Sequence, residues 1–219
     1  MPGDRRATAG RPRDRKVVCT IAHGPHQELL EIARPTLEKY ADGNGYELVA
    51  VEEQLAPHRP ASWGKVVLLH QLVQQYDVVL WVDADAVFVD PTRDVAAELQ
   101  PFRFLHLVSH RIGDERVYNC GVMALRGGSL SRRFLERVWN QHDLVHHEWW
   151  ENAAVLRLLG YRLDRPIRPE RLSPWRAGVG RLDGAWNSIP DCAAPSPVIA
   201  HFPAMAHAAR VEAMRAIAG

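Results

Sequence analysis

The sequence predicts an α/β fold in which helices flank a mainly parallel central sheet. Two observations lead to this prediction. Short apolar segments that favour strands alternate with longer helix-favouring segments through the first half of the 219 residues. One apolar segment, residues 78–82, has no polar side chain, so we expect it to be buried on both faces, as central parallel strands are.

In the first half of the chain, three expected strands alternate with two expected helices. Apolar and β-branched residues predict strands over residues 17–22, 46–51 and 78–82. A helix is expected from about Gln27 to Ala41, and Pro35 should kink or split it because proline has no N–H. Ser62 can cap a second helix. One face of that helix carries three apolar residues, Val66, Leu69 and Val73.

The second half is less regular. Apolar patterning predicts strands over residues 105–108, 120–125 and 198–200, with a polar loop through Asp114 between the first two. A helix should begin near Ser129 or Ser131, another should span 151–159 and end at Gly160, and an Ala-rich helix closes the chain. The inner face of the first of these helices is expected to hold Phe134, Leu135, Val138 and Trp139. Residues 164–197 are expected to form an ordered loop.

Length and charge limit the number of domains and the kinds of partner that the chain can have. Its length predicts one domain over residues 17–219. Residues 1–16 carry six basic and two acidic side chains without apolar periodicity, and are expected to form a disordered basic tail.

A net charge of +1 disfavours binding to nucleic acid or anionic lipid. No segment reads as a signal peptide or transmembrane span, which favours a cytoplasmic location. Three dispersed cysteines predict neither disulfides nor a zinc site.

The functional site is expected at Asp83-Ala84-Asp85, which directly follows the buried strand 78–82. In parallel α/β sheets, ligands bind at the carboxyl ends of the strands. Two carboxylates one residue apart can hold a hard divalent cation and leave positions open for phosphate oxygens. The alternative is that the two aspartates only cap a turn.

The wider context resembles a family of retaining glycosyltransferases, family 34, which includes fungal mannan galactosyl- and mannosyltransferases and plant xyloglucan xylosyltransferases. The similarity runs from about Val17 to Ala206. It implies a GT-A nucleotide-sugar-binding fold. The matching motifs are Tyr40-Ala41 with Gly45-Tyr46, Trp63-Gly64-Lys65, the Asp-x-Asp block, Asn119-Cys120-Gly121, Glu151-Asn152-Ala153-Ala154, Trp186-Asn187 and His201-Phe202.

The resemblance also implies roles for individual residues. The expected metal ligands are Asp83, Asp85 and His201, with manganese as the expected ion and magnesium as the alternative. The expected nucleotide and donor-sugar contacts are Ala22, His23, Lys65, Asp83 and Asn187. The expected catalytic residues are Glu151, Asn152 and Asn119. In one departure, Ala204 replaces the glycine that the family has three residues after its metal-binding histidine.

The expected reaction moves a hexose or pentose from a nucleoside diphosphate, by resemblance uridine diphosphate, to a hydroxyl of a glycan, lipid or small molecule, with retention. Two other functions stay open, a non-catalytic nucleotide-sugar-binding module and a sugar-phosphate nucleotidyltransferase. The second usually has a Gly-rich phosphate loop, which residues 22–26 are not. The segment His146-His147-Glu148 resembles a metal cluster without a placed third ligand. Trp149 and Trp150 are expected to form either an acceptor-facing shelf or part of the core.

Overall fold

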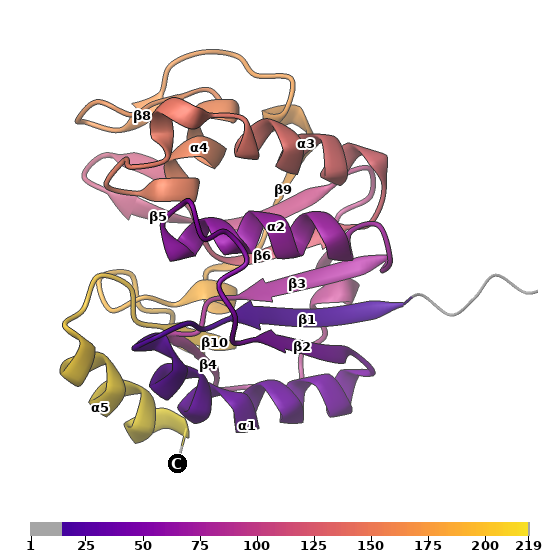
Figure 1. The fold of residues 1–219 in the computed structure, drawn as a ribbon, viewed down its shortest axis with the longest axis vertical. Helices are drawn as coiled ribbons and strands as arrows, with labels where there is room; N and C mark the ends of the chain where they lie inside the picture. The colour runs from indigo at the N-terminus through magenta and orange to yellow at the C-terminus, as the bar shows by residue number, and fades with distance from the viewer. Residues whose placement is uncertain (1–14, 219) are drawn as a thin grey trace, which may run out of the picture.

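The computed structural model describes residues 15–218, and its main layer is a six-stranded sheet in the order β2-β1-β3-β6-β5-β9 (Figure 1). The strands are β1 (Lys16–Ile21), β2 (Glu47–Val51), β3 (Val78–Val82), β5 (Leu105–Ile112), β6 (Glu115–Arg126) and β9 (Val179–Arg181). Five strands run in one direction, while β6 is antiparallel to its neighbours β3 and β5. The predicted mainly parallel sheet is confirmed.

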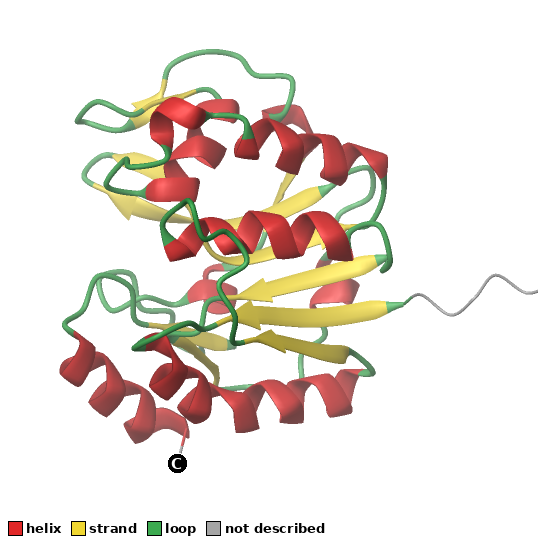
Figure 2. Ribbon diagram, in the orientation of Figure 1, coloured by secondary structure: helices red, strands yellow, loops and turns green. Residues whose placement is uncertain are grey.

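Helices cover the sheet on two sides (Figure 2). They are α1 (His26–Asn44), α2 (Gly64–Leu72), α3 (Ser129–Trp139), α4 (Trp150–Leu158) and α5 (His207–Ala218). Side chains from α2, α3 and α4 share one buried cluster with Val17 and Cys19 of β1, whereas those from α1 and α5 share a second cluster with Val18. Successive strand residues point to opposite faces, so the fold has three layers, helices, sheet and helices.

Two short strands bring the end of the chain to the end of β3. The strand β4 (Ala86–Phe88) begins one residue after Asp85 and pairs antiparallel with β10 (Ile199–His201). In this register His201 lies opposite Ala86. A further pair is formed by β7 (Tyr161–Arg162) and β8 (Arg168–Pro169). The β4–β10 pair therefore places residue 201 beside the Asp83-Ala84-Asp85 turn.

Most predicted elements are present, but Pro35 does not split its helix. The helix α1 runs without a break from His26 to Asn44. Pro35 removes one backbone hydrogen bond, and burial of Leu29, Leu30 and Leu37 on the inner face favours the continuous helix.

The predicted cap at Ser62 is wrong. The residue lies in the 3₁₀ turn η1 (Ala61–Trp63), and its hydroxyl is buried without a hydrogen-bond partner. The helix that follows begins at Gly64 with no side-chain cap. Burial of Trp63 orders this turn instead, since its indole donates to the carbonyl of Val145.

The second half is more regular than its sequence indicates. Strands β5 and β6 extend toward each other through the segment expected to be a polar loop, and form a long hairpin. The expected loop 164–197 contains β8 and also β9, which joins the edge of the main sheet beside β5. Three residues are too few for a strand periodicity to be visible.

Lys16, the last residue of the expected basic tail, belongs to β1. Residues 1–14 of the tail lie outside the described residues. Over residues 15–218, no helix has both the length and the apolar character required to cross a membrane.

Candidate active site

The sheet edge at the end of β3 holds the two aspartates in a defined turn. The N–H of Asp83 donates to the carbonyl of Gly121 on β6 at 2.8 Å, and its own carbonyl accepts from Ala86 at 3.0 Å. The carbonyl of Asp85 accepts from the N–H of Phe202 at 3.0 Å. Backbone bonds to β6 and to the residue after β10 therefore fix the positions of both aspartates.

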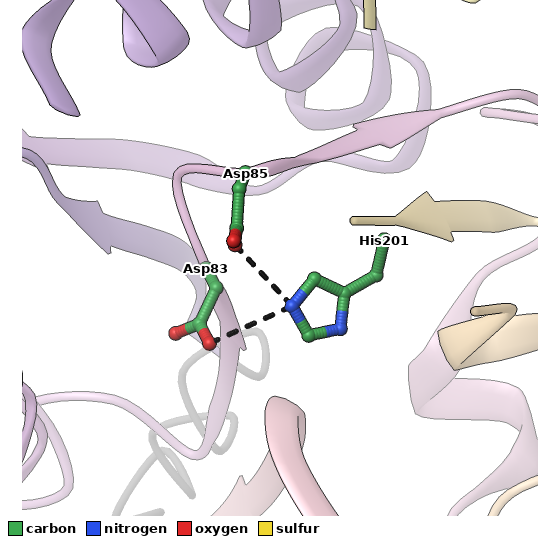
Figure 3. Close-up of side chains that lie close together, drawn as sticks. All are labelled: Asp83, Asp85 and His201. Carbon is green, nitrogen blue, oxygen red and sulfur yellow. Dashed lines mark ion pairs between the residues drawn. The ribbon is translucent and has the colours of Figure 1, made fainter. Parts of the chain in front are cut away.

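The imidazole of His201 points at both carboxylates (Figure 3). Its Nε2 lies 3.2 Å from Asp85 Oδ1 and 3.9 Å from Asp83 Oδ2. One ligand atom from each of the three residues lies within 4.8 Å of the others, so the group could hold a metal ion. Mixed carboxylate and imidazole donors suit manganese. The expected ligand set is thus brought together from positions far apart in the chain.

Asp85 is kept as a carboxylate by its surroundings. Burial alone would raise its pKa, but the hydrogen bond and charge of His201 in its protonated form, together with the charge of Arg210, hold the pKa of Asp85 below its ordinary value. The guanidinium Nη1 of Arg210, on α5, lies 3.3 Å from Asp85 Oδ2. The sequence analysis missed Arg210, and no local pattern singles it out in the Ala-rich final helix.

Lys65 is the buried cation of the site. Its Nζ lies 2.9 Å from Asp83 Oδ1, 2.8 Å from Glu151 Oε1 and 3.0 Å from the carbonyl of Cys120. Burial would lower the pKa of Lys65, but the charges of Asp83 and Glu151 raise it above the ordinary value. The side chain is 6% exposed, so it is an internal counterion rather than a solvated helix residue. Asp83 Oδ1 also accepts from the indole of Trp81 at 2.6 Å.

Glu151 and Asn152 enter from the first turn of α4. Glu151 is buried, and its second carboxylate oxygen, Oε2, has no hydrogen-bond partner. The side-chain oxygen of Asn152 accepts from the N–H of Cys120 at 2.8 Å. The free Oε2 atom can therefore accept a hydrogen bond, and the free end of Asn152 is its NH₂ group.

Two asparagines form a hydrogen-bonded chain on the Nδ1 side of the His201 ring. Asn187 Oδ1 is 2.8 Å from His201 Nδ1, and Asn187 Nδ2 donates to Asn119 Oδ1 at 2.9 Å. Asn119 Oδ1 also accepts from the N–H of Gly121 at 2.7 Å. A Cβ added to Gly121 would meet His201 Cε1 at 2.1 Å, so the histidine ring occupies the space beside this glycine.

Ala22 and His23 follow β1, which is the parallel neighbour of β3, so they lie at the same sheet edge as Asp83. Ala22 is buried and donates its N–H to the carbonyl of Val51 at 2.9 Å, whereas His23 is exposed. Within residues 15–218, no hydrogen bond or ion pair joins the His23 side chain to the metal-ligand group.

The segment His146-His147-Glu148 does not form a metal site in the described part of the chain. His147 Nδ1 accepts from the N–H of Trp149, and Glu148 pairs with Arg165. Trp149 packs against the core, whereas Trp150 is 47% exposed and has a φ of 42°. Of the pair, Trp150 is the more exposed, and it directly precedes Glu151 in the chain.

His110 on β5 is buried, and burial, followed by the charge of His201 when that imidazole is protonated, lowers the pKa of His110 to about 4, so it is neutral at pH 7. Ala204, which stands where the resembling family has glycine, has a φ of 57°. The backbone thus keeps a left-handed conformation that glycine adopts at lower cost.

Known proteins match this chain in structure rather than in sequence. No family model matches the sequence, and the search of curated proteins found no match. A glycosyltransferase involved in glycosylation of the major capsid of PBCV-1 superposes with a TM-score of 0.68 at 14% identity, over 92% of this chain and 100% of that one. The chain has a GT-A fold.

Two other structures with this fold agree. The galactosyltransferase LgtC, in complex with donor and acceptor sugar analogues, has a TM-score of 0.60 at 13% identity over 92% of this chain and 95% of its own. Mouse xyloside xylosyltransferase 1 has a TM-score of 0.55 at 12% identity, over 88% of this chain and 99% of its own. The GT-A fold expected from the resemblance is confirmed.

Proposed function

We propose that this protein is a metal-dependent glycosyltransferase that moves a sugar from a nucleoside diphosphate to an acceptor hydroxyl with retention. The observation that carries the proposal is the convergence of Asp83, Asp85 and His201 at the carboxyl-end edge of a GT-A sheet. The expected donor is a uridine diphosphate hexose or pentose. The expected acceptor is a glycan, lipid or small molecule that bears a hydroxyl.

The residues of the chain account for most of the proposed chemistry. A manganese or magnesium ion held by Asp83, Asp85 and His201 would stabilise the negative charge that develops on the departing diphosphate. Lys65 contacts both Asp83 and Glu151 and neutralises part of their negative charge. It stays protonated because its pKa is raised. It is therefore a fixed cation and not a base.

Glu151 is positioned to accept a hydrogen bond from a bound sugar. Lys65 holds its Oε1 at 2.8 Å, which leaves Oε2 buried and unpaired. A substrate hydroxyl that donates to Oε2 would remove the cost of leaving a buried acceptor unsatisfied. The amide of Asn152 is a poor covalent nucleophile, and its oxygen is already bonded to Cys120. Retention, with attack on the same face as the leaving group, is proposed from the resemblance to retaining glycosyltransferases.

The test uses purified protein with a panel of nucleotide sugars and Mn²⁺. We expect one donor to release its nucleoside diphosphate, slowly without acceptor and faster with it. Asp85→Asn and His201→Ala should lower both this release and metal-dependent nucleotide binding by about 100-fold or more. Asp42→Asn and His58→Ala, at exposed positions, are the matched controls and should be unchanged.

The same assay, repeated with a nucleoside triphosphate and a sugar phosphate as substrates, separates the alternatives. A binding module would bind the donor with metal but release no diphosphate. A nucleotidyltransferase would instead form a nucleotide sugar from a nucleoside triphosphate and a sugar phosphate, with release of pyrophosphate. Wild-type activity in Asp85→Asn and His201→Ala would overturn the proposal.

A further inference from the structure

The two asparagines behind His201 form a chain of hydrogen bonds whose direction is set at one end by the backbone. The N–H of Gly121 can only donate, and it donates to the side chain of Asn119 at 2.7 Å. The accepting atom is therefore the amide oxygen Oδ1. This backbone bond fixes which way the Asn119 amide faces.

The direction then passes to the second asparagine. Asn119 Oδ1 is also met by the Asn187 side chain at 2.9 Å. Only a donor can meet that oxygen, so the Asn187 atom is its NH₂ group. The opposite end of the same amide, Oδ1, must then face His201 Nδ1, at 2.8 Å. An amide oxygen only accepts, so Nδ1 must carry a hydrogen.

Burial makes this arrangement costly to reverse. Asn187 is fully buried and His201 is 2% exposed. Moving the imidazole proton to Nε2 would give Asp85 a donor but would leave two acceptors facing each other at Nδ1. A cation bound at Nε2 removes that gain, because the nitrogen must then offer its lone pair. A buried polar group left without a partner costs about 1–3 kcal/mol, and each 1.4 kcal/mol corresponds to a tenfold change in a tautomer ratio.

From these contacts we infer that Asn119 and Asn187 are positioning residues that hold neutral His201 as the Nδ1–H tautomer, with the lone pair of Nε2 directed at Asp83 and Asp85. The inference rests on the proposed function only for the purpose of the Nε2 lone pair, which is to bind the metal ion. Nε2 lies 3.2 Å from Asp85 Oδ1 and 3.9 Å from Asp83 Oδ2. In this tautomer Nε2 is an acceptor, like the carboxylate oxygens of Asp83 and Asp85 that it faces, and a bound cation would offset the repulsion among the three. An imidazole that binds metal through Nε2 needs Nδ1 protonated.

Gly121 connects both parts of the ligand set. Its N–H starts the amide chain to His201, and its carbonyl accepts from the N–H of Asp83 at 2.8 Å. Its lack of a side chain leaves room for the His201 ring. Asn187 thus acts through His201, and its full burial is consistent with a role that needs no direct contact with the donor.

The test reads the tautomer directly. Long-range ¹H–¹⁵N spectra of metal-free, ¹⁵N-histidine-labelled protein are recorded at about pH 9, above the ordinary imidazole pKa of about 6.5, with His201 assigned by its loss in His201→Ala. We expect a proton on Nδ1 and none on Nε2. A proton on Nε2 with none on Nδ1 overturns the inference.

Variants separate positioning from a general structural role. Asn119→Asp keeps an acceptor for Gly121 and Asn187, and should retain the Nδ1–H tautomer and Mn²⁺ binding. Asn119→Leu and Asn187→Leu remove the chain, and should shift the proton toward Nε2 and weaken Mn²⁺ binding, measured by calorimetry, by about 10- to 100-fold. Unchanged tautomer and affinity in folded Leu variants would contradict the inference.

Two results remain decisive if a Leu variant does not fold. The wild-type spectrum and the Asn119→Asp spectrum must both show the Nδ1–H tautomer, and failure of either overturns the inference. Failure of the proposed function is a separate result. A wild-type protein without Mn²⁺ binding or donor turnover would refute the function while leaving the tautomer measurement valid.

Discussion

Arg210 of α5 is in ion-pair contact with Asp85, with Nη1 3.3 Å from Oδ2 and both side chains 13% exposed. This guanidinium therefore places a fixed positive charge beside the proposed metal site. A cation bound at Asp85 is repelled by that charge, by an energy that falls with distance and with the local dielectric.

Removing the charge should tighten metal binding. For Arg210→Met without nucleotide, we expect the Mn²⁺ dissociation constant to fall by about three- to tenfold, because a nearby positive charge is lost. Calorimetry measures this constant. Arg215→Met, on the same helix but in an exposed pair with Glu28, is the control and should change little. Weaker binding in Arg210→Met would instead mean that the guanidinium mainly orients Asp85.

Lys65 should be important for stability as well as for the site. Lys65→Met leaves the buried Glu151 and the adjacent Asp83 without their cation, and we expect a loss of about 3–5 kcal/mol in the free energy of unfolding. Urea denaturation measures the loss. Lys39→Met, at an exposed position of α1, should stay within about 0.5 kcal/mol. Adding Glu151→Gln to Lys65→Met should recover part of the loss.

The pH dependence of this effect has a defined sign. Because the pKa of Lys65 is raised in the folded state, its contribution is fully present below the ordinary pKa of about 10.4 and is lost only as pH rises through the higher folded value. We therefore expect the stability difference between wild type and Lys65→Met to be at least as large at pH 9 as at pH 7. A difference that vanishes by pH 9 would contradict a permanently charged Lys65.

Gly121→Ala should damage the metal site without breaking the fold. The new Cβ would lie 2.1 Å from His201 Cε1 and 2.6 Å from Nδ1, so the ring must move. We expect Mn²⁺ binding to weaken by about tenfold or more, and unfolding free energy to fall by about 1–3 kcal/mol. Gly43→Ala, in α1 with open space around it, should be neutral or stabilising by up to about 1 kcal/mol. Equal metal affinity in both variants would contradict this close packing.

Ala204→Gly should stabilise the protein. Ala204 is exposed with a φ of 57°, a conformation that costs an L-residue about 1–2 kcal/mol. After the greater entropy loss of glycine is counted, we expect a gain of about 0.5–1 kcal/mol in thermal or urea unfolding. Ala208→Gly, exposed in the first turn of α5, should change stability in the opposite direction. A loss of stability in Ala204→Gly would show that Ala204 makes a contact that offsets the strain.

Local sequence patterns determined the strands and helices that carry the site. Residues 78–82 form a buried strand because their side chains are all apolar, and Asp83 ends it because a carboxylate cannot continue that burial. The same reasoning identified the sheet as mainly parallel and located its carboxyl-end edge. It failed at Ser62, where burial of Trp63 decided the backbone, and of the two outcomes expected at Pro35 the split does not occur.

Contacts between distant residues were decided only by the tertiary structure. Lys65 and Glu151 are 86 positions apart, and Asn119 and Asn187 are 68 apart, so no local periodicity reveals either pair. Arg210 reaches Asp85 because α5 packs beside α1 and β4. The sequence by itself determined which residues could end strands near one edge, since that depends on neighbouring side chains. Which of them share a hydrogen bond or a charge depends on how β6, β10 and α5 pack against β3 and β4.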